Sequence, residues 1–91
     1  MKQLERIFKG LANRRRLAII KILLKRKVMT VAEIAGEINL SFTSTSKHLA
    51  ILRQLDIVDC QQKSLSVYYS ISKSLPEVVQ LLSKSISNSR E

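Results

Sequence analysis

The chain has 91 residues, 45% of them hydrophobic, and its 16 Lys and Arg against 7 Asp and Glu give a formal net charge of +9. We expect one cytoplasmic domain over residues 1–91 with no membrane partner, because no apolar stretch approaches the roughly 20 residues of a membrane span, and the charge favours polyanionic partners. A single cysteine, Cys60, excludes an internal disulfide and a multi-thiolate metal cage, and it fits a reducing compartment.

An apolar stripe at helical spacing predicts a first helix near the N-terminus. The stripe consists of Leu4, Ile7, Phe8 and Leu11. Gly10 is expected to end or bend this helix. Asn13 is a suitable N-cap for a second helix that runs to about Lys25 and is apolar around most of its circumference, so the second helix is expected at the centre of the fold.

A short third helix is predicted to follow. Thr30 and Glu33 have the spacing of a capping box, which would start this helix, and the helical pattern ends at Ile38. Asn39 comes next, and asparagine is the residue after glycine that most readily adopts the left-handed conformation at a helix end. A tight turn is therefore expected at Asn39.

Ser41 is expected to cap a fourth helix that runs from Phe42 to about Leu55. The inward stripe of this helix is expected to contain Thr45, Leu49, Leu52 and Leu55. Its first two turns carry short hydroxyl side chains and Lys47, which can hydrogen-bond base edges or phosphates without holding the helix away from DNA. Two short helices of this kind are typical of a helix-turn-helix that binds the major groove.

After Asp56 the apolar residues no longer follow helical spacing but occur at every second position. This spacing predicts a β-hairpin with its turn at Lys63 and Ser64. The residues expected to share one face of its second strand are Leu65, Val67, Tyr69 and Ile71. On the first strand Val58 and Cys60 point to the same side, which favours Cys60 as a small buried hydrophobe over a redox switch.

Ser74, Pro76 and Glu77 predict the start of a last helix, with the proline in its first turn. The apolar residues of this helix are Val78, Val79, Leu81, Leu82 and Ile86. The order helix, helix, helix-turn-helix, hairpin, helix predicts a mostly α fold with a small β-hairpin, the winged helix-turn-helix.

Four fragments follow one another in the chain: residues 11–19 (LANRRRLAI), 31–35 (VAEIA), 46–49 (SKHL) with Leu52 and Arg53, and 67–71 (VYYSI). In sequence and order they resemble the ArsR family of prokaryotic winged-helix transcription repressors, over roughly residues 11–71. The resemblance implies a repressor that binds double-stranded DNA in a sequence-specific manner.

The candidate DNA-binding residues lie at the start of the fourth helix and at the hairpin tip. They are Ser41, Phe42, Thr43, Ser44, Ser46, Lys47, His48 and Lys63. The alternative for the hydroxyl cluster is a capped helix start alone. The resemblance places His48 near the DNA backbone, whereas a lone histidine on a packed helix is as often structural. Phe42 replaces the family's usual polar residue and is expected to pack under the turn, with contact to a thymine methyl as the alternative.

Residues 14–16 are three arginines that open the second helix, where the helix dipole disfavours positive charge. Phosphate contact is one explanation for their presence, and ion pairs with Glu5, Glu33 or Glu37 are the alternative. For Arg16, which matches an arginine of the family, a structural role is equally expected. The basic run at residues 25–27 is expected to be a solvated helix end rather than a DNA contact.

The resemblance also implies a homodimer in which the first and last helices of two chains pair across a two-fold axis. The residues expected in this interface are Leu4, Ile7, Phe8, Leu11, Val78, Val79, Leu82 and Ile86. Such a dimer would place its DNA-contacting helices about 34 Å apart, one turn of B-DNA, and would bind a pseudo-palindromic operator.

The metal ligands of the family are missing from this chain. The family's paired cysteines correspond to Thr30 and Ala32, and residues 75–91, where a second family site uses His and carboxylates, hold only Glu77 and Glu91 as candidates. No metal, cofactor or catalytic residue is therefore expected, and an enzyme is the least favoured class. Two alternatives to a repressor stay open: an architectural protein that coats DNA through phosphates alone, and a winged-helix module for protein–protein contact.

Overall fold

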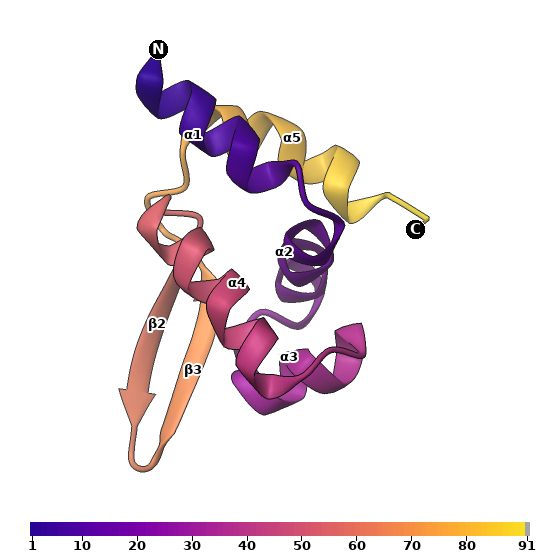
Figure 1. The fold of residues 1–91 in the computed structure, drawn as a ribbon, viewed down its shortest axis with the longest axis vertical. Helices are drawn as coiled ribbons and strands as arrows, with labels where there is room; N and C mark the ends of the chain where they lie inside the picture. Colours follow the sequence, from indigo (N-terminus) through magenta and orange to yellow (C-terminus); the bar gives the residue numbers. More distant parts are fainter. Residues whose placement is uncertain (91) are drawn as a thin grey trace.

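The computed structural model describes residues 1–90, and Glu91 lies outside the described range. Its helices are α1 (Lys2–Leu11), α2 (Arg14–Arg26), α3 (Val31–Ile38), α4 (Phe42–Gln54) and α5 (Glu77–Ser87). Its strands are β1 (Met29–Thr30), β2 (Val58–Lys63) and β3 (Ser66–Ile71), which form one antiparallel sheet in the order β1-β3-β2. This is the winged helix-turn-helix that the sequence predicts (Figure 1).

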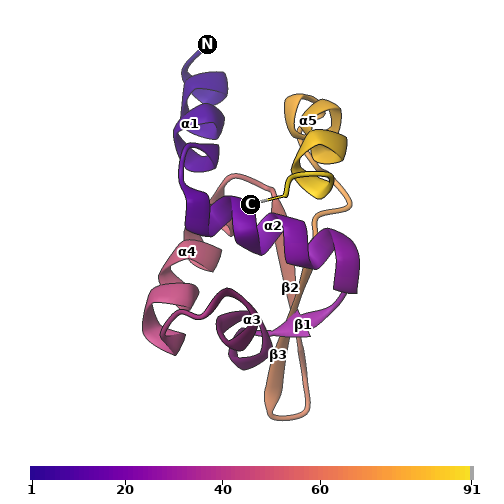
Figure 2. The ribbon, with the colours of Figure 1, turned by 90° about the vertical axis from the view of Figure 1, so that its right-hand side faces the viewer.

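Helix α2 lies at the centre, with α1 and α5 toward one end of the molecule and α3, the start of α4 and the hairpin toward the other (Figures 1 and 2). Its side chains Ile19, Ile20 and Leu23 are at most 1% exposed. A helix that is apolar on most of its surface is stable when neighbours cover it, and the predicted central position is confirmed. Within residues 1–90, no helix is both long enough and apolar enough to cross a membrane.

The predicted starts of α2 and α3 are confirmed. The Asn13 side chain accepts hydrogen bonds from the backbone N–H groups of Arg15 (2.9 Å) and Arg16 (3.1 Å). In the capping box before α3, the Thr30 hydroxyl accepts from the Glu33 N–H (3.2 Å), and the Glu33 carboxylate accepts from the Thr30 N–H (2.8 Å). These side chains satisfy N–H groups that a first helical turn leaves without a partner.

The turn between α3 and α4 has the predicted geometry. Asn39 adopts the left-handed conformation (φ 57°, ψ 51°), and Ser41 caps α4 by accepting from the Ser44 N–H (3.1 Å). The hydroxyl of the buried Thr45 donates to the Ser41 carbonyl (2.7 Å). The inward stripe of α4 consists of Thr45, Leu49 and Leu52, with Leu55 partly buried beside it. This stripe fixes which face of α4 stays at the surface.

Gly10 is not the residue that ends α1, because the helix continues to Leu11. Gly10 is buried, and a Cβ at this position would overlap the Cδ1 of Leu55, the residue that follows α4. The glycine therefore permits a close approach between the ends of two helices rather than an unusual backbone conformation.

The hairpin differs from the prediction at its tip. β2 and β3 stay paired as far as Lys63 opposite Ser66, so the turn residues are Ser64 and Leu65. Leu65 is 97% exposed and does not share a face with the apolar residues of β3, which corrects the prediction. Ser64 has a positive φ of 59°, a conformation that tight hairpin turns use.

Two other features were not predicted. β1 pairs Met29 with Tyr69 across the sheet, but two residues are too few to show an alternating pattern in the sequence. Helix α5 begins at Glu77, after Pro76 rather than around it, and Ser74 provides no side-chain cap. The Ser74 N–H donates to the neighbouring Ser72 hydroxyl (3.0 Å).

Candidate DNA-binding interface

The outward face of α4 brings together most of the candidate DNA-binding residues. Among them, Ser41, Phe42, Thr43 and Lys47 are exposed, whereas Ser44, Ser46 and His48 are half-buried. Thr43 and Lys47 lie one helical turn apart, and the Lys47 ammonium makes no hydrogen bond or ion pair within residues 1–90. Short hydroxyls beside a free ammonium can donate to the base acceptors of a major groove and to phosphates.

Phe42 is 60% exposed and does not pack under the turn, so the favoured prediction for it is wrong. In a helix the Cα–Cβ bonds tilt toward the N-terminus. The side chain of the first residue of α4 therefore extends beyond the helix end instead of joining the inward stripe. Its apolar ring is open to contact with a thymine methyl, the alternative that the sequence left open.

The hairpin carries polar side chains close to its tip. Lys63 ends β2 and is exposed, as are the preceding Gln61 and Gln62. A lysine at a hairpin tip can reach a phosphate as the wing of a winged helix does. Cys60 lies further from the tip, opposite Tyr69, and is half-buried, which is less burial than the sequence predicts.

The three arginines at the start of α2 form no ion pair with a glutamate within residues 1–90, so that alternative is wrong. Glu5 pairs with Lys9 (Oε1–Nζ 3.2 Å), and Glu37 pairs with Arg26 (Oε1–Nη2 2.8 Å). Arg14 is exposed, and phosphate contact stays a prediction for it.

Arg16 instead makes contacts inside the domain. Its Nε donates to the Gly10 carbonyl (2.6 Å), and its Nη1 lies 3.2 Å from the Nδ1 of His48. Burial lowers the pKa of His48 below its ordinary value of 6.5, and the positive charges of Arg16 and Arg15 act in the same direction. These contacts support the structural interpretation of Arg16, and they place His48 in a defined environment on α4.

The residues predicted for a dimer interface divide into two groups. Ile7, Leu11 and Val79 are at most 6% exposed and belong to the chain's own core, so they are not available to a partner. Leu4 and Phe8 are exposed, and the half-buried members are Val78, Leu82 and Ile86. Leu81, which was not in the predicted set, is 76% exposed on α5. Helical spacing shows that apolar residues share one side of a helix, but it does not show which of them are buried in the chain's own core and which stay at the surface.

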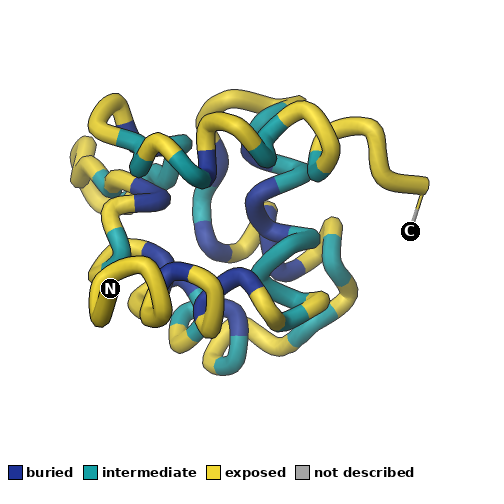
Figure 3. Tube along the Cα trace, turned by 90° about the horizontal axis from the view of Figure 1, so that it is seen from above, coloured by how far each residue is buried: buried dark blue, intermediate teal, exposed yellow. Residues whose placement is uncertain are grey.

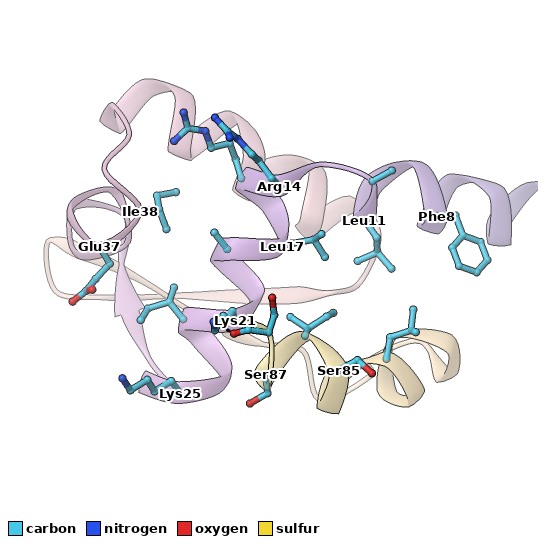
Figure 4. A pocket seen from close by; sticks show the side chains of 17 residues that line it. Phe8, Leu11, Arg14, Leu17, Lys21, Lys25, Glu37, Ile38, Ser85 and Ser87 are labelled. Carbon is cyan, nitrogen blue, oxygen red and sulfur yellow. Dashed lines mark hydrogen bonds between the residues drawn. The ribbon is translucent and has the colours of Figure 1, made fainter. Parts of the chain in front are cut away.

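A groove of about 1180 Å³ is lined by residues of α1, α2, α3 and α5. In Figure 4, Phe8 and Leu11 extend from α1 over it, Leu17 and Lys21 lie along α2, and Ser85 is on α5. Seen from above, most of α1 and the chain after α5 are exposed (Figure 3). Apolar side chains of α1 and α5, among them Phe8 and Leu82, thus lie beside an open groove.

The family's metal-ligand positions have other roles here. Thr30 caps α3, and Ala32 is exposed on the first turn of that helix. Within residues 1–90, there is no group of three or more His, Cys, Asp or Glu side chains that could hold a metal ion.

A turn-linked helix pair with a polar outward face, flanked by a hairpin with a lysine near its tip, defines a winged-helix DNA-binding protein. Residues 13–59 match the sequence pattern of the bacterial regulatory proteins of the arsR family. The chain belongs to this family, and it is a DNA-binding transcriptional regulator.

Individual relatives agree with this assignment. The chain is 32% identical over 77 residues to the transcriptional activator HlyU of Vibrio cholerae, covering 84% of this chain and 70% of HlyU. It is 35% identical over 69 residues to the transcriptional repressor SdpR of Bacillus subtilis, covering 76% of each. Its structure resembles a homodimeric winged helix-turn-helix DNA-binding domain from Mycobacterium bovis, with a TM-score of 0.78, 29% identity and coverage of 93% of this chain and 75% of that one.

Proposed function

We propose that the chain is a homodimeric repressor that binds a pseudo-palindromic operator in the bacterial cytoplasm. The outward face of α4 is the observation that carries this proposal, because it offers Thr43, Ser46 and Lys47 to a major groove while Thr45 anchors the helix. That face is flanked by Ser41, Phe42, Ser44 and His48. From the hairpin, Lys63 would contact the phosphate backbone of the DNA. The chain would act as a single domain over residues 1–91.

Dimerisation is supported by the apolar side chains that α1 and α5 leave at the surface. Phe8 is 48% exposed and lines the groove, and Leu81 is 76% exposed on α5. We propose that the groove receives the same helices of a second chain. The structurally similar domain from Mycobacterium bovis is itself homodimeric. We propose Leu4, Phe8, Val78, Leu81, Leu82 and Ile86 as the interface.

The sign of regulation differs between the two relatives, since SdpR is a repressor and HlyU an activator. We infer repression because binding alone can block a promoter, whereas activation also needs a surface that recruits the transcription machinery. Transcription in vitro from a promoter that overlaps the selected operator should fall when the protein is added. A rise would reverse the assignment.

The test of the function is selection of bound sequences from a randomised DNA pool at about physiological salt, where non-specific electrostatic binding is weak. A palindromic motif with half-sites about one helical turn apart is the expected result. Retention of DNA without an enriched motif would favour an architectural protein, and no retention would favour a protein-contact module.

The test of the dimer is analytical ultracentrifugation at micromolar concentration, where a dimer is expected. Leu81→Ser should shift the protein toward monomer without unfolding it, because this side chain is largely exposed in the single chain. Leu65→Ser is the matched control, since Leu65 is 97% exposed at the hairpin tip, far from α1 and α5. A wild-type monomer would contradict the proposal.

A further inference from the structure

One guanidinium joins three helices of the domain. Arg16 is in the first turn of α2, and its Nε donates to the carbonyl of Gly10 near the C-terminal end of α1 (2.6 Å). Its Nη1 lies 3.2 Å from the Nδ1 of His48, in the middle of α4. A single side chain therefore links the helix proposed for dimerisation to the helix proposed for DNA binding.

The Gly10 carbonyl suits this contact. The last carbonyls of a helix have no partner within the helix and carry partial negative charge, so a cationic donor is favourable there. The positive charge that is unfavourable at the start of α2 is thus offset by the end of α1. This explains why an arginine stands at position 16.

The contact with His48 dictates the chemical form of the imidazole ring. A guanidinium has only N–H donors and stays protonated in proteins. The Nδ1 that faces it must therefore offer a lone pair, which excludes the protonated ring and the tautomer with hydrogen on Nδ1. The ring that remains is neutral and carries its hydrogen on Nε2.

Burial and nearby positive charge also favour the neutral form of the His48 ring. Burial lowers the pKa of His48, and Arg16 and Arg15, both on α2, lower it further. A neutral ring with an Nε2–H is still a hydrogen-bond donor, and it needs no counter-charge when DNA is absent. At half burial, on the helix that carries Lys47, such a donor suits a phosphate oxygen.

We propose that Arg16 is a positioning residue for DNA binding: it holds His48 in the Nε2–H tautomer, so that α4 presents a fixed donor to a phosphate, and it locks α4 against the end of α1. The phosphate contact rests on the proposed function, whereas the tautomer and the lock are properties of the free protein. The two parts can therefore fail separately.

The tautomer is tested by ¹⁵N NMR of the imidazole ring in the free protein near pH 7.5. His48 is the only histidine in the chain, so every imidazole signal in the spectrum belongs to it. The expected result is the Nε2–H form in the wild type and a mixture of tautomers in Arg16→Met. Arg14→Met removes the same charge from the same turn and should leave the tautomer unchanged. A wild-type ring that is protonated, or hydrogenated on Nδ1, would overturn the proposal.

The role in binding is tested on the selected operator. Arg16→Met should weaken binding about tenfold on specific and non-specific sequences alike, because a phosphate contact carries no sequence information. In a His48→Ala background the same change should have a much smaller effect. An equal loss in both backgrounds would show that Arg16 acts on DNA directly, and it would overturn the positioning role.

Substitutions of His48 separate its two nitrogens. The Asn amide lies near the position of Nδ1 and the Gln amide near that of Nε2, so His48→Gln should retain more affinity than His48→Asn. The reverse order would contradict a donor at Nε2. Arg16→Lys should not restore binding, because one ammonium does not match the forked donors that span Gly10 and His48. Circular dichroism of each variant confirms that it is folded.

Discussion

Leu55 occupies the space that a side chain on Gly10 would need. A Cβ on Gly10 would overlap the Leu55 Cδ1, and the backbone of α1 therefore lies directly against the residue that follows α4. The carbonyl oxygen of Gly10 also accepts a hydrogen bond from Arg16. The missing side chain and the carbonyl together fix how the end of α1 meets α4.

Gly10→Ala is expected to change the stability of the protein little, because the gain in helix propensity of about 1 kcal/mol is offset by the displacement of the Leu55 side chain, whose terminal Cδ1 is the atom overlapped. In a Leu55→Ala background, which opens the space, the same substitution should stabilise the protein instead. Urea unfolding of the four proteins measures both effects as a double-mutant cycle. Stabilisation by Gly10→Ala in the wild type would show that Leu55 moves aside at little cost.

The features that could be predicted from the sequence depend on neighbours in the chain. The caps at Asn13, Thr30 and Ser41 and the left-handed turn at Asn39 all join groups within a few residues of one another. Their physical cause is present in any short segment with the same residues, whatever the rest of the fold does. The order of the elements follows from the same local patterns, and the family resemblance agrees with it.

The features that could not be predicted depend on distant partners. Arg16 and His48 are 32 residues apart, and Met29 pairs with a tyrosine in the second hairpin strand. The apolar stripe of α1 contains both Ile7, which is 5% exposed, and Phe8, which is 48% exposed. Periodicity gives a helix its apolar side, but only the packing of the other helices decides how far that side is covered.

The capping box before α3 predicts a specific dependence of stability on pH. The pKa of Glu33 lies below its ordinary value of 4.5, chiefly because its carboxylate accepts the Thr30 N–H, with the Thr30 hydroxyl acting in the same direction. The unfolded chain thus binds the proton more readily. The contribution of the ionised Glu33 carboxylate to the stability of the fold is complete above pH 4.5. It is lost as the pH falls through the lower pKa that Glu33 has in the folded state.

Glu33→Gln should remove this part of the acid dependence while keeping an oxygen acceptor for the Thr30 N–H. Urea unfolding between pH 7 and pH 3 should give a flatter decline for the variant than for the wild type. Glu5→Gln, which makes the same change of charge on α1 in the pair with Lys9, serves as the control. Equal declines in wild type and Glu33→Gln would contradict the assignment.

Lys63 at the hairpin tip is expected to contact one phosphate. Lys63→Ala should therefore weaken DNA binding similarly on all sequences and reduce the slope of log K against log salt concentration by about one unit. Titrations between low and physiological salt measure the slope. Lys2→Ala removes the same charge from the exposed start of α1 and should change the slope much less. If the two variants match, the hairpin does not touch DNA.

Lys47 is expected to contact a base rather than a phosphate. It is exposed on the second turn of α4, one turn after Thr43 and beside Ser46, where side chains of a DNA-contacting helix face base edges. Lys47→Ala should therefore lose about 1–3 kcal/mol of discrimination at one position in each half-site, while preferences elsewhere stay unchanged. Competition between the operator and its single-base variants measures this loss. An equal weakening on every sequence would instead make Lys47 a phosphate contact, and base recognition would then fall to Thr43, Ser46 and the exposed ring of Phe42.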